Sequence, residues 1–105
     1  MSQSVIPIES MTYESYLDGK IRLYRYGKVR ILVFSWDGPI SETLQTLATL
    51  DSGDRPVNTV LVSIPGWATG NRQRIYVTNL GEVGIASRSG SYSDWFFGEI
   101  SWIVP

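Results

Sequence analysis

The chain has 105 residues, with 9 Lys and Arg against 10 Asp and Glu, for a formal net charge of -1. Its length is that of a single domain, and its 43% hydrophobic content is too high for intrinsic disorder. The balanced charge argues against a nucleic-acid partner, because phosphate neutralisation needs a basic excess or a basic stripe.

The sequence contains neither cysteine nor histidine. Their absence excludes disulfides, thiol nucleophiles, Ser-His-Asp and Cys-His catalysis, and nearly all zinc, iron and copper sites. A carboxylate-lined calcium site stays open, but the pair Asp51 and Asp54 is a sparse match to a calcium loop. We therefore expect no metal and no other cofactor.

No run approaches the roughly 18 consecutive apolar residues of a membrane-spanning helix, so we expect no membrane insertion. The N-terminal MSQSVIPIES lacks the basic segment and apolar run of a secretory signal, which predicts a soluble protein made in the cytoplasm. Residues 1–12 also lack strand alternation. They predict an N-terminal arm or linker in front of a domain over residues 13–105.

Strand-like alternation begins at residue 20. Residues 20–26 alternate apolar side chains with arginines, which predicts a strand with one solvated face. A turn at Gly27 leads into a second strand over residues 29–36, and the Asp-Gly-Pro sequence at 37–39 predicts the end of that strand.

The segment 41–50 fits two structures. Leu44, Leu47 and Leu50 lie three residues apart, as in a short helix. The threonines of the segment and the surrounding β pattern favour an extended strand, which is our expectation.

The rest of the chain repeats a simple order of strands and turns. The predicted strands are 57–64, 72–78, 82–88 and 94–104, and the intervening loops are 51–56, 65–71, 79–81 and 89–93. About seven or eight short antiparallel strands without a convincing helix predict an all-β fold, a single β-sandwich or jelly-roll-like domain.

Aromatic residues make up 12% of the chain and include four tryptophans. Trp67 lies in a glycine-flanked loop, and Tyr92 and Trp95 flank Asp94 at the end of another. Sugar rings have apolar C–H faces and polar edges, so a saccharide site combines a stacking aromatic with groups that bond hydroxyls. The candidate carbohydrate-binding residues are Trp67, Asn71, Arg72, Tyr92, Asp94 and Trp95.

The aromatic residues also fit ordinary packing. For Trp102 and Phe97 we expect a place in the sandwich core or in a subunit interface. For Trp67 and Tyr92, packing and ligand binding both stay open.

Basic residues gather on the first predicted hairpin. They are Arg22, Arg25, Lys28 and Arg30. Such a cluster either faces an anionic polymer or, more commonly, keeps a solvated face soluble, and we expect the second.

Paired carboxylates are the one enzymatic arrangement left to consider. A glycosidase needs two carboxyl groups about 5–10 Å apart across a cleft. Asp94 and Glu99 are separated by an odd number of residues, so they face opposite sides of a regular strand, while Asp51 and Asp54 are typical turn residues. We therefore expect no enzyme, and a carboxylate-based glycan hydrolase is the weakest alternative.

The sequence LDSGDRP at 50–56 is followed by a Val-rich strand. It resembles the L-P-x-G-y-R-P element of one family, the C-terminal domains of tail-fibre and baseplate proteins from phages and prophages of Gram-positive bacteria. Residues 78–83, TNLGEV, resemble its hairpin turn, and the aromatic-rich residues 95–104 resemble its closing strand. The resemblance covers roughly residues 20–105.

The same element departs from the family at two positions. Asp51 stands in place of a proline and Asp54 in place of an aromatic residue, so another residue must fill any core space that the aromatic occupies. Gly53, Arg55 and Pro56 carry over as a structural element, because Gly permits the turn and Pro fixes φ before the next strand.

The resemblance implies a β-sandwich or jelly-roll head domain that forms a homotrimer in the tail or baseplate of a virion. It implies a host cell-surface saccharide and other tail or baseplate subunits as partners. The family's binding residues vary and lie in loops, so no individual site residue transfers. The alternative is a structural or assembly module of the tail, in which exposed aromatics dock onto neighbouring subunits and no glycan binds.

Overall fold

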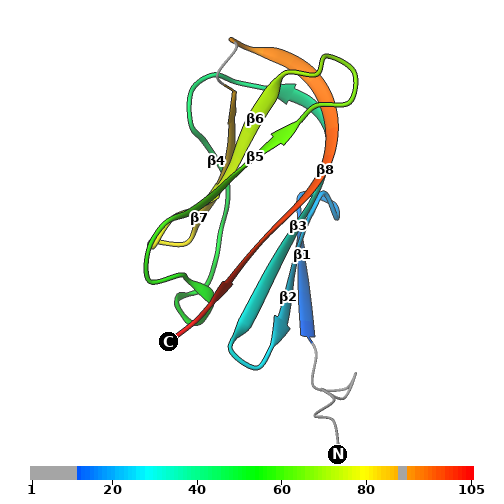
Figure 1. Cartoon of the computed structure of the whole chain (residues 1–105). Helices are drawn as coiled ribbons and strands as arrows, with labels where there is room; N and C mark the ends of the chain where they lie inside the picture. The colour runs from blue at the N-terminus through cyan, green and yellow to red at the C-terminus, as the bar shows by residue number, and fades with distance from the viewer. Residues whose placement is uncertain (1–11, 88–89) are drawn as a thin grey trace, which may run out of the picture.

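The computed structural model describes residues 12–87 and 90–105. These residues form eight strands in two antiparallel sheets of four (Figure 1). The strands are β1 (Thr12–Tyr16), β2 (Ile21–Tyr26), β3 (Val29–Ile40), β4 (Gln45–Thr49), β5 (Val60–Pro65), β6 (Arg72–Val77), β7 (Glu82–Ser87) and β8 (Tyr92–Ile103). The predicted all-β sandwich is confirmed.

The first sheet has the strand order β1-β2-β3-β8, and the second has the order β4-β7-β6-β5. In Figure 1 the two sheets lie as two layers, with β8 running along the edge of the first next to β5. A Cβ on Gly98 of β8 would lie 1.9 Å from Cδ1 of Ile64 on β5, so glycine is needed where these strands meet. The β5–β8 edge therefore brings the loops of both sheets together.

The core fills the space between the layers. Alternate residues of each strand point inward, which is the pattern expected for a sheet with one buried face. The largest fully buried apolar side chains are Phe34, Phe96, Ile21, Leu23, Leu32, Ile40, Leu50, Ile75, Val77 and Val83.

Strand β8 shows this alternation most clearly. Phe96 and Trp102 point into the core, with 1% and 7% of their surface exposed. Phe97 lies on the opposite face and is 65% exposed, so of the two places expected for it the core is wrong, and the subunit interface stays a prediction. The reason is the twofold period of the strand, which separates neighbours onto different faces.

Several strand boundaries differ from the prediction: β5 begins at Val60, β8 begins at Tyr92, and the end of β3 differs most. β3 does not end at the Asp-Gly-Pro sequence but continues through Pro39 to Ile40, paired with β8. β2 flanks β3 only as far as Phe34, so among the described residues no strand flanks the later part of β3 on that side, where a proline is tolerated. The segment 41–50 contains the expected strand, shortened to β4.

The start of the chain also differs. The predicted arm over residues 1–12 lies outside the described residues except for Thr12, which begins β1. Sequence patterning gave no strand there, yet β1 pairs with β2 along its whole length, with Tyr13 opposite Tyr24.

The loop between β4 and β5 is held by the buried Asp54. Its carboxylate accepts hydrogen bonds from Arg25 Nε (2.8 Å) and Nη2 (2.7 Å) and from Arg30 Nε (2.7 Å). Its backbone oxygen accepts one from Trp102 Nε1 at 2.8 Å. Asp54 therefore ties the loop to both the β2–β3 hairpin and the core. The Arg25 hydrogen bond, followed by that of Arg30, lowers the pKa of Asp54.

This arrangement corrects the expected role of the basic cluster. Arg25 and Arg30 are bound to Asp54 and serve packing, whereas Arg22 and Lys28 are exposed. The described part of the chain contains no helix of the length and apolarity needed to cross a membrane.

Candidate functional site

The loop at residues 66–71, between β5 and β6, is fixed to β8 by Asp94. The Asp94 side chain is buried and accepts hydrogen bonds from the backbone amides of Ala68 (2.9 Å), Thr69 (3.0 Å) and Trp95 (2.7 Å), and from the Thr69 hydroxyl. These bonds, that of the Thr69 hydroxyl above all, lower the pKa of Asp94 to about 2. Asp94 therefore stays ionised and supports the loop.

Close packing around Asp94 explains the glycine at the start of this loop. A Cβ on Gly66 would lie 2.0 Å from Oδ2 of Asp94. The Gly66 amide donates to the Asn71 carbonyl oxygen at 2.8 Å, which closes the loop on itself. The Trp67 amide donates to the Trp95 carbonyl oxygen at 2.9 Å, which joins the loop to β8.

Two indole rings stack above this supported loop. The rings of Trp67 and Trp95 have centroids 5.0 Å apart and planes inclined by 8°. Both remain accessible, with 69% and 49% of their surface exposed. Phe97 lies two residues beyond Trp95 on the same face of β8. We call Trp67, Trp95 and Phe97 the aromatic platform.

The aromatic platform borders an open hollow of about 450 Å³ at the β5–β8 edge. It is lined by Ile64, Pro65, Gly66, Trp67 and Phe97. A flat apolar ring held on a rigid loop suits the C–H face of a sugar, and a neighbouring hollow gives the ligand room.

The remaining sequence candidates have different surroundings. Asn71 ends the same loop and is half-buried, and its side-chain amide has no hydrogen-bond partner within the described residues. Arg72 is exposed on the outer face of the second sheet, where Nε donates to Ser63 Oγ at 2.9 Å and Nη2 to the Ser63 carbonyl at 3.1 Å. Tyr92 points to the core side of β8 and donates its hydroxyl to Gln73 Oε1 at 2.8 Å.

The structure thus unites part of the predicted set. Trp67 and Trp95 stack, Asp94 supports them from below, and Asn71 closes the loop. Arg72 and Tyr92 are each engaged with other parts of the fold. Phe97 was missed as a surface residue, although its spacing of two from Trp95 in a strand indicated a shared face.

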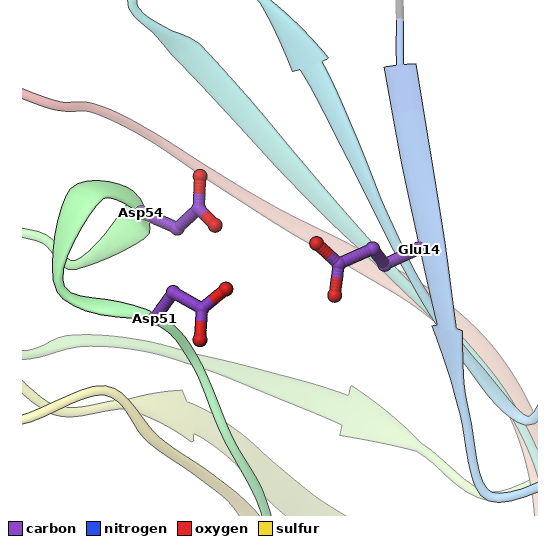
Figure 2. A group of neighbouring side chains, drawn as sticks. All are labelled: Glu14, Asp51 and Asp54. Carbon is purple, nitrogen blue, oxygen red and sulfur yellow. The ribbon is translucent and has the colours of Figure 1, made fainter.

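Three carboxylates gather at a different place, between β1 and the β4–β5 loop. The side chains of Glu14, Asp51 and Asp54 point toward one another, with ligand atoms within 4.8 Å (Figure 2). Arg25 already bonds to both Glu14 and Asp54 through Nη2, and Tyr16 donates its hydroxyl to Glu14 at 3.1 Å. These contacts make the group an ionic connection between hairpin and loop, and it offers a cation few free oxygens.

Asp94 and Glu99, the remaining carboxylate pair, lie on opposite faces of β8 as the alternation predicts. Asp94 is buried and Glu99 exposed. They therefore do not flank a common cleft, which is the arrangement that a pair of glycosidase carboxylates requires.

No protein-family model matches the chain, and no curated protein is similar to it in sequence. The resemblance to phage tail domains therefore stays a prediction.

Proposed function

We propose that this domain binds carbohydrate without catalysing a reaction, and that the aromatic platform stacks against the sugar. The observation that carries the proposal is the exposed Trp67–Trp95 stack on a loop fixed by Asp94. Exposed tryptophans are costly to hydrate, and aromatic rings favour the C–H faces of sugars. Because the loop is already ordered, binding loses little conformational entropy.

Polar groups beside the platform complete the proposed site. The side-chain amide of Asn71, which has no hydrogen-bond partner in the described part of the chain, offers both a donor and an acceptor for sugar hydroxyls. Asp94 acts indirectly, because its oxygens are occupied by the loop that it holds.

The biological setting of the proposal rests on the sequence resemblance. We place the domain in the tail or baseplate of a phage virion, as a homotrimer that attaches to a host cell-surface saccharide beside other tail subunits. A small open site binds a sugar weakly, and several linked copies raise the effective affinity by orders of magnitude.

A second candidate function is an assembly module of the tail. Its support is the apolar surface on the outer face of β8, where Phe97 and Ile103 are 65% and 69% exposed. Large exposed apolar patches often mark protein interfaces. In that role the aromatic platform is covered by a neighbouring subunit and binds no glycan.

A screen of immobilised bacterial cell-wall saccharides, with light scattering on the same sample, separates the two functions. Carbohydrate binding predicts retention of the wild-type chain, loss of retention in Trp67→Ala, and no change in Leu80→Ala. Leu80 is a suitable control because it is 62% exposed and lies in the β6–β7 turn. An oligomer that is not retained, and whose tryptophans resist a soluble quencher, would replace this proposal with the assembly module.

A further inference from the structure

Two hollows on the outer face of the first sheet adjoin the hollow beside the aromatic platform through shared lining residues. The hollow beside the aromatic platform is bordered by Phe97, and Phe97 also borders a second hollow of about 250 Å³. The second is lined by Gly19, Arg22, Tyr24, Val33, Ser35 and Phe97. A third, of about 490 Å³, shares Gly19, Arg22 and Tyr24 and adds Tyr13, Ser15 and Asp18. Each hollow borders the next through these shared residues, and we call this row of three hollows the cross-sheet groove.

Strand pairing shows that this groove runs across the strands. Ser35 of β3 lies opposite Phe97 of β8, and Tyr24 of β2 lies opposite Tyr13 of β1. The groove therefore crosses all four strands of the sheet and continues to Trp67 beyond its edge. The row is slanted, because Tyr24 lies opposite Ile31 of β3 and not opposite Ser35. With strands about 4.8 Å apart and a rise of about 3.3 Å per residue, its length is roughly 20 Å, several sugar rings long.

Aromatic side chains lie at both ends of the groove, with polar side chains between them. Tyr13 and Tyr24 stack at its far end with centroids 5.7 Å apart, and Phe97 and Trp67 lie at the other end. Polar groups, including the guanidinium of Arg22, lie between them. Among the described residues Arg22 forms no salt bridge, unlike Arg25 and Arg30 of the same hairpin. Its donors are free for a ligand.

The charges in the groove are balanced. Arg22 and Asp18 line the same hollow, and they carry opposite charges. Such a pair supplies donors and acceptors without favouring a strongly charged ligand, which suits the hydroxyls of an uncharged sugar chain. The aromatic rings on either side suit its C–H faces.

We propose that the cross-sheet groove binds an extended oligosaccharide chain, which runs from the aromatic platform past Phe97 and Arg22 to Tyr24 and Tyr13. This inference rests on the proposed carbohydrate-binding function and defines its substrate as an internal stretch of chain. A single terminal sugar would engage only the platform. Arg22 and Tyr24 are then determinants of specificity for chain length.

The test compares short and long fragments of one repeat. The probes are the disaccharide and the hexasaccharide of chitin, cellulose, galactan and the wall polysaccharide of a Gram-positive bacterium, titrated into the full chain. In at least one series the hexasaccharide is expected to bind about tenfold more tightly or better. Tyr24→Ala and Arg22→Gln remove that gain and leave disaccharide affinity unchanged, whereas Trp67→Ala weakens both fragments.

Matched controls exclude general effects of charge and folding. Lys28→Gln removes the same charge from an exposed position of the same hairpin, and Tyr26→Ala removes the same ring from the same strand, outside the groove lining. Both are expected to keep the full gain. Thermal unfolding of every variant confirms that it is folded, and Arg22→Gln serves where Tyr24→Ala is unstable.

These outcomes distinguish failure of the groove proposal from failure of the proposed carbohydrate-binding function. The groove proposal is overturned if both fragment lengths bind with equal affinity. It is also overturned if the higher affinity for the hexasaccharide survives in both Tyr24→Ala and Arg22→Gln. If Trp67→Ala still weakens binding in that case, carbohydrate binding stands. If no probe binds, both the groove proposal and the proposed carbohydrate-binding function are overturned. Burial of the groove in an oligomer would instead identify a second copy of the chain as its occupant.

Discussion

The indole rings of Trp67 and Trp95 stack with centroids 5.0 Å apart although they belong to different sheets, one to the β5–β6 loop and the other to β8. The stack depends on Asp94, because that carboxylate binds the amides of Ala68, Thr69 and Trp95 together. The buried carboxylate of Asp94 therefore holds the exposed Trp67–Trp95 stack in position.

Circular dichroism can test the stacking of Trp67 on Trp95. Two indoles stacked at this distance couple their electronic transitions, so the wild-type circular dichroism spectrum is expected to contain an exciton couplet that requires both Trp67 and Trp95. Replacing either residue with phenylalanine removes the couplet, while Leu80→Ala keeps it. A couplet that persists in both tryptophan variants would contradict the stacked geometry.

The glycine at position 66 is expected to be intolerant of any side chain. In Gly66→Ala the new Cβ would lie 2.0 Å from Oδ2 of Asp94, which forces the loop and the carboxylate apart. Overpacking of this kind costs about 1–3 kcal/mol of unfolding free energy, measured by urea denaturation. Gly53→Ala is the control, because nothing lies within 4 Å of its Cβ position, and its stability is expected to be nearly unchanged. Equal stability of both variants would refute the tight contact.

The ion pairs of Asp54 give a second stability prediction. Asp54→Ala leaves Arg30 without a carboxylate and Arg25 with Glu14 alone, and both side chains are largely buried, which is expected to cost about 3–5 kcal/mol. Asp51→Ala changes an exposed acid in the same loop, and we expect a loss below about 0.5 kcal/mol. Similar losses for the two variants in urea unfolding would show that Asp54 does not anchor the loop.

The pH dependence of stability follows from Asp94. Its pKa is about 2 in the folded chain and about 3.9 when unfolded, so the folded state favours the ionised form. This contribution is complete above about pH 4 and is lost as the pH falls toward 2. The lowered pKa of Asp54 acts in the same direction.

Unfolding free energies measured between neutral pH and pH 2 test this prediction. The wild-type curve is expected to fall steeply below about pH 4, and Asp94→Asn, which cannot ionise, should show a shallower fall. Parallel curves for the two proteins would mean that Asp94 titrates normally.

Local sequence patterns predict the parts of the fold that depend on local chemistry. Sequence patterning located the strands other than β1, and the glycine-flanked position of Trp67 placed it in a loop. Alternation also supports the inward positions of Phe96 and Trp102. Each of these features is decided within a few neighbouring residues.

The features that the sequence did not predict depend on contacts between residues that lie far apart in the chain. No local pattern shows that Asp94 meets the amides of the β5–β6 loop, or that Asp54 meets arginines from the first hairpin. The extension of β3 through Pro39 depends on which strand flanks it, and that is a property of the sheet. The cross-sheet groove likewise exists only once four strands are assembled.

The most direct measurement is the affinity of wild-type and Trp67→Ala chains for the saccharide retained in the cell-wall screen, paired with their unfolding free energies. If the sugar stacks on the aromatic platform, Trp67→Ala is expected to bind the saccharide about tenfold more weakly or worse than the wild type. The stability change is expected to be at most about 1.5 kcal/mol, the value of a lost aromatic stack. Unchanged affinity, or a loss that appears only because the variant unfolds, would contradict carbohydrate binding at Trp67.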